Sequence, residues 1–285
     1  MRFHKMQACG NDFVIVDHRS GIPSGFAFTS RLAAKVCDRH FGVGCDQILW
    51  LKPGSGETAA TVAILNADGS TAEMCGNGMR AIGLHLARRG ENPGKKRYSV
   101  RVESGSGSSV LVEIDLAGKF PEVALGVPLV KNLEESIVAP GLDRFGKFAR
   151  VEVGNPHAVF FLPDPALDAI DLARDGAAIE RDPLFPNRTN VEFAAVLDRR
   201  TIRVRVWERG AGATLACGSG ACAVAAAAEA RGLVDAGERI EIRLPGGSVF
   251  VRLEAGWRDG RGRALLSGPA EDVFSGEWAD SGSSS

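Results

Sequence analysis

The sequence predicts an α+β protein made of two similar halves, on three observations. Most apolar runs are short, rich in β-branched residues and alternate with polar residues, as half-buried strands do. The runs follow one another in pairs, which favours antiparallel sheets over repeating β-α-β units. The same polar landmarks also recur in the same order in both parts of the chain, at a spacing of about 140 residues.

The expected elements follow this pattern along the chain. Strands are expected at residues 13–16, 61–65, 98–103, 109–115, 151–153, 158–162, 191–196, 201–207, 239–244, 249–254 and 263–267. Apolar residues at helical spacing predict helices over residues 31–39, 79–89 and 221–231. The small residues at 104–109 predict a hairpin turn, and residues 275–285 are expected to form a frayed tail.

The repeat is the most informative feature. Asn11 and Asn155 each follow a glycine and precede a strand, 144 residues apart. Gln47 precedes Ile48-Leu49 and Asn190 precedes Val191, 143 residues apart. Cys-Gly-Asn-Gly at 75–78 and Cys-Gly-Ser-Gly at 217–220 each open a helix, 142 residues apart. We expect a duplicated fold with its two equivalent sites at a cleft between the halves, where small-molecule pockets often lie.

Composition excludes several function classes. The 285 residues include 35 acidic and 34 basic side chains, so the formal net charge is −1 and gives no electrostatic reason to expect nucleic acid or an anionic membrane as partner. Residues 210–228 carry no charge, but their first half is glycine, threonine and serine, which predicts a loop that leads into a buried helix. A small-molecule substrate is therefore expected.

The beginning of the chain lacks the apolar stretch of a signal peptide, so a cytoplasmic protein with reduced thiols is expected. Its six cysteines form no Cys-x-x-Cys pair, and no closely spaced histidine pair accompanies them, so we expect no metal site. Those outside the two Cys-Gly-x-Gly motifs are interpreted as inert packing residues: Cys9, Cys37, Cys45 and Cys222.

The two motif cysteines, Cys75 and Cys217, suggest proton transfer at carbon. The first backbone N–H groups of a helix have no internal partner and favour anions. A thiol there can have its pKa lowered from about 8.5 toward neutrality. One thiolate could remove a proton beside a carboxylate while the other thiol returns a proton on the opposite face, with the N–H groups stabilising the charge. This chemistry inverts an α-carbon and needs no cofactor.

Three other functions compete with this hypothesis. Gly-x-Gly-x-x-Ala at 76–81 and at 218–223 fits a dinucleotide-binding fingerprint, although a glycine-rich stretch at 208–216 separates the second copy from its strand. A redox sensor would use the thiols without turnover. A cysteine hydrolase would need one such cysteine and a histidine base.

Longer stretches around these landmarks resemble the diaminopimelate epimerases. The matching motifs are Lys-Met at 5–6, Gly-Asn-Asp-Phe at 10–13, Asp-Gln at 46–47, Asn-Ala-Asp-Gly-Ser at 66–70, Ala-Glu-Met-Cys-Gly-Asn-Gly at 72–78, Gly-Asn-Pro-His at 154–157, Thr-Asn-Val-Glu-Phe at 189–193, Trp-Glu-Arg-Gly at 207–210 and Cys-Gly-Ser-Gly at 217–220. The chain departs from the usual pattern at Cys9, Ala213 and Ser219.

The resemblance implies two pseudo-symmetric domains, each of antiparallel strands wrapped around a central helix. It implies interconversion of LL- and meso-2,6-diaminopimelate, a step toward lysine and peptidoglycan, or a related racemisation of another amino acid. Cys75 and Cys217 would be the acid/base pair, assisted by Glu208 and His157. Further positions match the family's substrate pocket: Asn11, Gln47, Asn66, Gly76, Asn77, Asn155, Asn190, Glu208, Arg209, Gly218 and Ser219.

These inferences divide the chain at residues 120 and 262. Residues 1–120 form the half that carries Cys75, completed by a strand at 263–274, and residues 121–262 form the half that carries Cys217. The active site would lie in the cleft between them. An amino-acid substrate is the expected partner, with a homodimer as a further possibility because relatives of this kind often pair.

Overall fold

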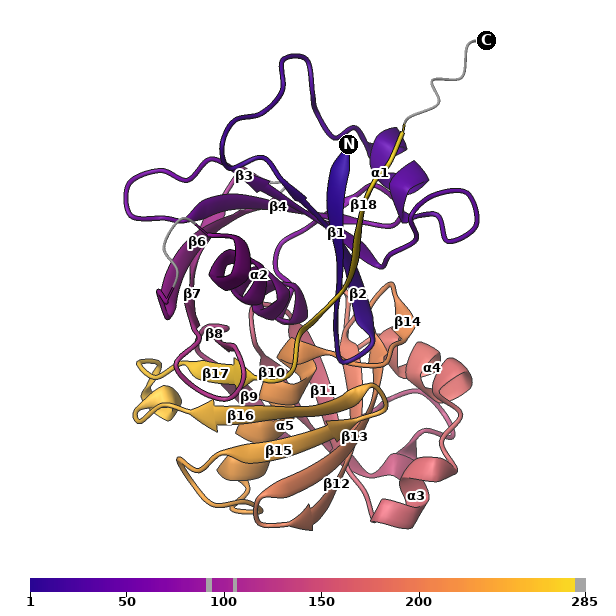
Figure 1. Ribbon diagram of the computed structural model, residues 1–285. Coiled ribbons are helices and arrows are strands. Elements are labelled where there is room, and N and C mark those ends of the chain that lie inside the picture. Colours follow the sequence, from indigo (N-terminus) through magenta and orange to yellow (C-terminus); the bar gives the residue numbers. More distant parts are fainter. Residues whose placement is uncertain (91–93, 105–106, 280–285) are drawn as a thin grey trace. The chain divides into compact units, whose positions relative to one another are not determined.

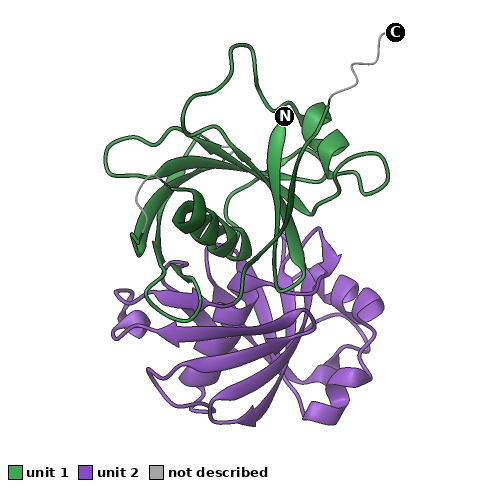
Figure 2. Cartoon of the chain, viewed as in Figure 1, with its two compact units in different colours: residues 1–123, 269–285 green, residues 124–268 purple. Residues whose placement is uncertain are grey.

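The structure is a computed structural model that describes residues 1–90, 94–104 and 107–279. The chain forms two compact units, which Figure 2 shows in different colours. Unit 1 comprises Met1–Val123 and the segment from Pro269 onward, and unit 2 comprises Ala124–Gly268. Among the described residues, no helix is long and apolar enough to span a membrane.

Unit 1 surrounds the helix that begins after Cys75. Its elements are β1 (Arg2–Ala8), β2 (Asn11–Asp17), α1 (Ser30–Cys37), β3 (Gln47–Lys52), β4 (Ala60–Asn66), β5 (Thr71–Ala72), α2 (Gly76–Arg89), β6 (Arg97–Glu103), β7 (Ser109–Asp115), β8 (Glu122–Ala124, at the boundary) and β18 (Glu271–Glu277). The strands pair in the order β18-β1-β2-β3-β4-β6-β7-β8, with β5 on β4. Most of α2 is buried, and it contacts β1, β2 and β7 (Figure 1).

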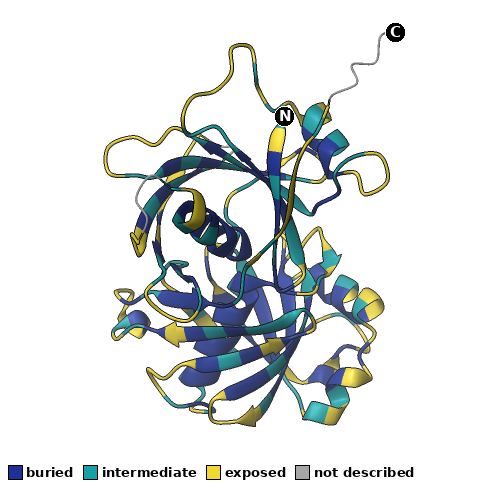
Figure 3. Ribbon diagram, viewed as in Figure 1, coloured by how far each residue is buried: buried dark blue, intermediate teal, exposed yellow. Residues whose placement is uncertain are grey.

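Unit 2 surrounds the helix that begins after Cys217. Its elements are β9 (Leu129–Ser136), η1 (Asp143–Phe145), β10 (Lys147–Glu152), β11 (Pro156–Phe161), α3 (Asp164–Asp168), η2 (Leu172–Gly176), α4 (Ala177–Glu180), β12 (Asn190–Asp198), β13 (Thr201–Glu208), β14 (Gly212–Ala213), α5 (Gly218–Ala230), β15 (Ile240–Leu244), β16 (Gly247–Leu253), η3 (Trp257–Asp259) and β17 (Ala264–Ser267). The alanine-rich α5 is buried on nearly all sides, as expected of a helix that lies inside a curved sheet (Figure 3).

The two units share one order of strand pairing. In unit 2 the order is β9-β10-β11-β12-β13-β15-β16-β17, with β14 on β13, so each strand of unit 1 has a counterpart. The expectation of antiparallel strands is corrected in one respect: β2–β3, β4–β6, β11–β12 and β13–β15 are parallel. Parallel neighbours need long crossover connections, and α2 and α5 lie in two of them.

Most of the predicted elements are present, with ends within a few residues. The sequence analysis did not list β1, β3, β5, β8, β9 or β14, nor the short helices of residues 164–180. The strand expected at 263–274 to complete unit 1 is two strands, of which β17 belongs to unit 2 and β18 to unit 1. β9 and β18 are largely exposed, so their sequences lack a buried apolar face. β18 runs to Glu277, three residues into the expected tail, and residues 280–285 lie outside the described part. Residues 105–106 of the expected hairpin turn also lie outside it.

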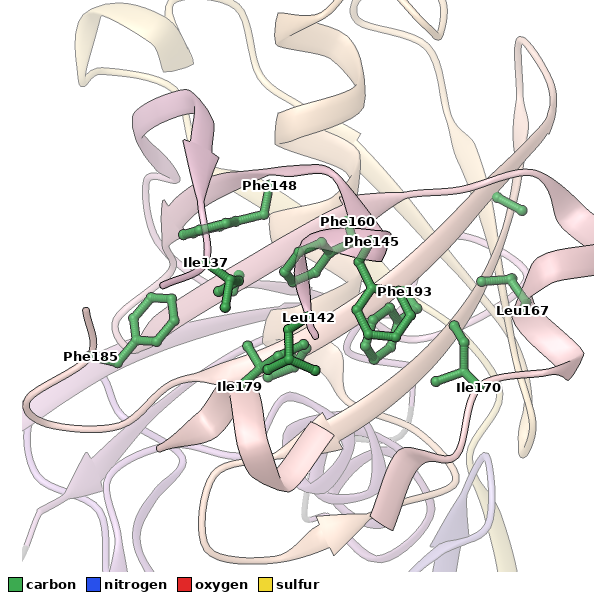
Figure 4. Close-up of a cluster of buried hydrophobic side chains, with 13 residues drawn as sticks. Ile137, Leu142, Phe145, Phe148, Phe160, Leu167, Ile170, Ile179, Phe185 and Phe193 are labelled. Atoms are coloured by element: carbon green, nitrogen blue, oxygen red, sulfur yellow. The ribbon is translucent and has the colours of Figure 1, made fainter. Parts of the chain in front are cut away.

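A hydrophobic cluster that includes five phenylalanines packs against the strands of unit 2 that carry its polar site (Figure 4). The rings of Phe160 on β11 and Phe193 on β12 stack with their centroids 5.4 Å apart. Successive side chains of a strand point to opposite faces. The neighbouring His157 and Glu192 therefore lie on the other face of the same strands, the face that α5 covers.

Candidate active site

Cys75 is the N-cap residue of α2. Its backbone is extended, with φ −144° and ψ 103°, and its sulfur accepts a hydrogen bond of 3.3 Å from the backbone N–H of Gly78. The sequence produces this arrangement because the thiol satisfies one of the unpaired N–H groups of the first turn, as a serine hydroxyl does at other N-caps. The thiol is partly exposed.

Cys217 repeats the arrangement in unit 2. It is the N-cap of α5 with φ −120° and ψ 115°, and its sulfur accepts a hydrogen bond of 3.4 Å from the N–H of Gly220. The hydroxyl of Ser219 lies 3.6 Å from the sulfur. Each unit therefore presents one thiol at the positive end of one buried helix.

Amide side chains surround the thiol of unit 1. Asn11 Oδ1 lies 3.7 Å from Cys75 Sγ and accepts a hydrogen bond of 3.5 Å from Asn77 Nδ2. Gln47 pairs with Asn66 across β3 and β4, and Gln47 Nε2 donates to Asn66 Oδ1 at 2.9 Å. The structure thus forms two amide pairs within this unit from four of the predicted residues.

A buried acid and a buried histidine lie in unit 2. His157 Nδ1 is 2.7 Å from Glu192 Oε1, and neither side chain is exposed to solvent. The other ring nitrogen, Nε2, is 2.8 Å from Asn155 Oδ1. A hydrogen bond on each nitrogen fixes the orientation of the ring.

Glu208 connects this region to the thiol. It stands at the end of β13, and its Oε1 accepts a hydrogen bond of 2.5 Å from Thr214 Oγ1. It also hydrogen-bonds Cys217. Burial raises the pKa of Glu208, while the hydrogen bonds from Thr214 and Cys217 act in the opposite direction.

The turn after Glu208 is held by Asn190 and Glu180. Asn190 Oδ1 accepts a hydrogen bond of 2.9 Å from the N–H of Arg209, while its Nδ2 donates to Pro156 O at 2.9 Å. Glu180 accepts from the N–H of Gly210 at 3.2 Å. The guanidinium of Arg209 donates to Asn187 O at 3.3 Å. Both ends of the Asn190 amide therefore hydrogen-bond to backbone groups of unit 2.

The electrostatics of Cys217 correct one expectation. Burial raises the pKa of this thiol well above its usual range, and the carboxylates of Glu208 and Glu192 raise it further. The N–H of Gly220 acts in the opposite direction but does not outweigh them. The surroundings of Cys217 therefore favour its neutral thiol, whereas its position at the helix start suggested a lowered pKa.

Several supporting residues were missed by the sequence analysis. Asp46 accepts a hydrogen bond from Asn11, Ser70 accepts one from Asn66, and Thr214 donates one to Glu208. Glu192 was quoted only as part of a motif, although a glutamate inside the apolar strand at 191–196 was a usable signal of a buried polar contact. Among the described residues, no group of three or more metal-ligating side chains occurs. The expected absence of a cofactor stays a prediction.

Comparison with known proteins gives consistent matches over nearly the whole chain. A family model described as "Diaminopimelate epimerase" matches residues 3–126 and 149–264. The chain is 40% identical over 289 residues to a protein of Xanthomonas axonopodis pv. citri with the name "Diaminopimelate epimerase", covering 98% of this chain and 96% of the relative. A protein of Carboxydothermus hydrogenoformans with the same name is 40% identical over 287 residues, covering 98% and 99%.

Solved structures of lower identity share the fold. A PhzF-family phenazine biosynthesis protein from Bacillus anthracis matches with a TM-score of 0.74 and 14% identity, covering 98% of this chain and 99% of that chain. A probable proline racemase from Agrobacterium radiobacter K84 matches with a TM-score of 0.70 and 17% identity, covering 98% and 92%. These likenesses concern the fold alone, and they confirm the predicted α+β class.

Proposed function

This chain belongs to the diaminopimelate epimerase family, and we propose that it inverts an α-carbon of 2,6-diaminopimelate with Cys75 and Cys217 as its acid/base pair. The resemblance that its motifs suggested is confirmed, and the enzyme is an isomerase of lysine biosynthesis. The observation that carries the two-thiol proposal is the repeated N-cap: each unit places one cysteine sulfur on the third N–H of its central helix.

The proposed reaction is a proton exchange at one carbon. A thiolate removes the α-proton, and the electron pair of the broken C–H bond delocalises into the neighbouring carboxylate. The other thiol donates its proton to the opposite face, so the carbon leaves with inverted configuration and the two sulfurs have exchanged roles. The first-turn N–H groups of Gly76, Asn77, Gly218 and Ser219 would stabilise the extra charge on the carboxylate.

Different side chains would orient the two ends of the substrate. Glu208 and His157 would hold the ammonium at the reacting carbon, with Glu192 as the residue that orients His157. An amino-acid head needs both donors and acceptors, which amide side chains supply. We propose that this role belongs to Asn11, Gln47, Asn66, Asn77, Asn155 and Asn190, and that Arg209 pairs with the distant carboxylate.

The remaining expectations stay proposals. The reaction needs no cofactor, because the thiols and the helix N–H groups supply the acid, the base and the charge stabilisation. An active site between residues 1–120 and 121–262, a cytoplasmic location and a homodimer also remain predictions.

Turnover of LL-diaminopimelate in deuterated water tests the proposal. The wild-type protein should form the meso isomer with deuterium at the inverted carbon, as followed by chiral chromatography and mass spectrometry. Cys75→Ala and Cys217→Ala should each lower kcat/KM by about 10²- to 10⁴-fold, the usual contribution of one acid or base. Unlabelled meso product would exclude exchange with solvent.

Cys222→Ala is the matched control. Cys222 lies within α5, the helix that Cys217 caps, and is fully buried. It has no proposed part in the chemistry. Its activity should stay close to wild type. Normal turnover by either cap variant would remove that thiol from the mechanism, provided that circular dichroism shows the variant to be folded.

A further inference from the structure

A second pair of thiols lies close together in unit 1, outside the proposed acid/base pair. Cys37 ends α1, and Cys45 lies two residues before β3. The thiol of Cys45 donates toward Cys37, with the two sulfur atoms 3.4 Å apart. The backbone N–H of Cys45 also donates to Cys37 O at 3.1 Å. The two chain segments are therefore held side by side by their backbones as well as by their sulfurs.

The charges around the pair favour ionisation of one partner. The hydrogen bond from Cys45 lowers the pKa of Cys37, and the ammonium of Lys5 lowers it further, against burial and the carboxylates of Asp12 and Asp46. The same hydrogen bond and burial raise the pKa of Cys45. Lys5 is itself held by Gly44 O and by Asp12, whose Oδ2 lies 2.6 Å from the ammonium. Cys37 is thus the nucleophilic member of a pair in which Cys45 is the proton donor.

The pair is connected to the amide group beside Cys75. Asp46 directly follows Cys45, and its Oδ2 accepts hydrogen bonds from Asn11 Nδ2 at 2.7 Å and from the N–H of Asp12 at 3.1 Å. The N–H of Asp46 donates to Asp12 O at 3.0 Å. A displacement of Cys45 therefore acts on Asn11 through one residue.

We propose that Cys37 and Cys45 are a redox-active dithiol, which a peroxide converts reversibly to a disulfide that disturbs the contact between Asp46 and Asn11. A disulfide has a sulfur–sulfur distance of about 2.05 Å, shorter than the 3.4 Å between the thiols. Side-chain rotation can make up part of the difference, and in this proposal a shift of the segment that carries Asp46 makes up the rest.

The oxidation balances in two steps. The thiolate of Cys37 attacks one oxygen of hydrogen peroxide, the O–O bond breaks, and a sulfenic acid and water form once the leaving hydroxide is protonated. The sulfur of Cys45 then displaces the hydroxyl group from the sulfenic acid, which gives the disulfide and a second water. Peroxide accepts two electrons, one from each thiol sulfur. A dithiol reductant reverses the change by thiol–disulfide exchange.

The test uses the full chain with Cys75→Ala and Cys217→Ala, so that the proposed catalytic thiols cannot react. The protein is treated with hydrogen peroxide, the remaining thiols are alkylated, and trypsin cuts after Arg39, between the two cysteines. We expect the peptide of residues 36–39 to be joined to the peptide that contains Cys45, and to be released by dithiothreitol. Cys45→Ser in the same background is the control and should give no joined peptide.

A second measurement tests the connection to Asn11 without any substrate. Amide hydrogen exchange of Asp12 and Asp46 should be faster in the oxidised protein, because both amides donate hydrogen bonds within the displaced network. Failure to form the joined peptide at a peroxide dose that oxidises free cysteine would overturn the dithiol. A joined peptide with unchanged exchange at both amides would overturn the coupling.

The consequence for substrate rests on the proposed function and has its own readout. Binding of diaminopimelate to this variant, measured by calorimetry, should weaken about threefold to tenfold on oxidation, the value of roughly one neutral hydrogen bond. Absence of binding in the reduced protein would count against the proposed substrate. The dithiol would then be tested by the peptide and hydrogen-exchange results alone. Equal affinity of the two forms would contradict the coupling.

Discussion

At the scale of single residues, the two units differ most in what they place behind the thiol. The strand register makes His157 of unit 2 the counterpart of Phe13, since each pairs in parallel with the first residue of the next strand, Asn190 or Gln47. By the same register Glu192 is the counterpart of Leu49. The two units thus share one strand arrangement, in which unit 2 has a histidine and an acid where unit 1 has two apolar side chains.

Glu192→Gln tests the influence of this acid on the second thiol. The amide oxygen can still accept from His157, but the negative charge that raises the pKa of Cys217 is removed. The pKa of Cys217 should therefore fall. The rate of iodoacetamide reaction at Cys217, followed against pH in a Cys75→Ala background, measures it. Identical profiles with and without the substitution would show that Glu192 has no electrostatic effect on this thiol.

Asp12 should make unit 1 less stable as the pH becomes acidic. Burial would raise the pKa of Asp12, but hydrogen bonds from Arg39 and Lys5 outweigh it and lower the pKa to about 2. The stabilisation is present above the unfolded pKa of about 3.9 and is lost as pH falls toward 2. Asp12→Asn should lower the free energy of unfolding by about 1–2 kcal/mol at pH 6.

Urea unfolding of both proteins between pH 6 and pH 3 provides the measurement. The difference between wild type and Asp12→Asn should shrink as the pH falls, because Asp12 of the unfolded wild-type chain then becomes protonated while the folded carboxylate stays ionised. A difference that stays constant over this range would mean that the ion pairs with Lys5 and Arg39 contribute nothing through the charge.

The sequence allowed the candidate site residues to be identified, but it did not allow their side-chain contacts to be predicted. The landmarks Cys75, Cys217, Asn11 and Asn155 were identifiable because glycine and helix starts surround them. The contact between Cys37 and Cys45 was not, and the prediction of inert packing residues did not foresee it. Two cysteines eight residues apart meet only because the loop after α1 folds back on the helix end.

At the scale of elements, the helix starts depend on glycine for space. A Cβ on Gly78 would lie 3.1 Å from Leu49 Cδ2, whereas a Cβ on Gly220 would lie 2.6 Å from Glu192 Oε1. The first contact can relax by a small shift of a methyl group. The second cannot relax easily, because Glu192 is buried and fixed by His157. Both central helices therefore need a glycine at this position, but the neighbour that requires it is a leucine methyl group in unit 1 and a fixed carboxylate in unit 2.

Gly220→Ala and Gly78→Ala form a matched pair of substitutions. We expect Gly220→Ala to lower the free energy of unfolding by about 1–3 kcal/mol, the usual cost of overpacking, and Gly78→Ala to lower it less. Thermal unfolding of both variants measures the difference. A larger loss for Gly78→Ala would contradict the assignment of Glu192 as the rigid neighbour.

The elements that sequence predicted are those with a buried face. β4, β6 and β13 alternate buried and less buried residues, and the period is visible. β9 and β18 expose most of their side chains and are held as strands chiefly by backbone pairing with β10 and β1. Pairing with a distant partner leaves no local signal, so such strands could not be predicted.

At the scale of the whole molecule, the last strand pairs with the first. β18 pairs antiparallel with β1 over most of its length, and Trp278 exchanges backbone hydrogen bonds with Met1. Asp272 accepts from Arg88 and Arg89 at the end of α2. The last strand thus completes unit 1, whose other strands come from the first 124 residues.

A chain that ends at Gly268 should lose stability in unit 1 alone. β1 would keep only β2 as a neighbour, so its amides should exchange faster, while those of α5 and β12 should stay protected. Hydrogen exchange with mass spectrometry reads both units in one sample, and unit 2 is the internal control. Equal loss of protection in both units would contradict independent completion of unit 1 by β18.

The sequence by itself determined the α+β class, the duplication, the two cysteine-capped helices and the family, because each leaves a local pattern of periodicity, glycine spacing or repeated motif. Only the tertiary structure decided the parallel pairings, the buried Glu192 beside His157, the raised pKa of Cys217 and the contact of Cys37 with Cys45. These depend on distances between residues far apart in the chain, and burial and charge act through those distances rather than through neighbours in sequence.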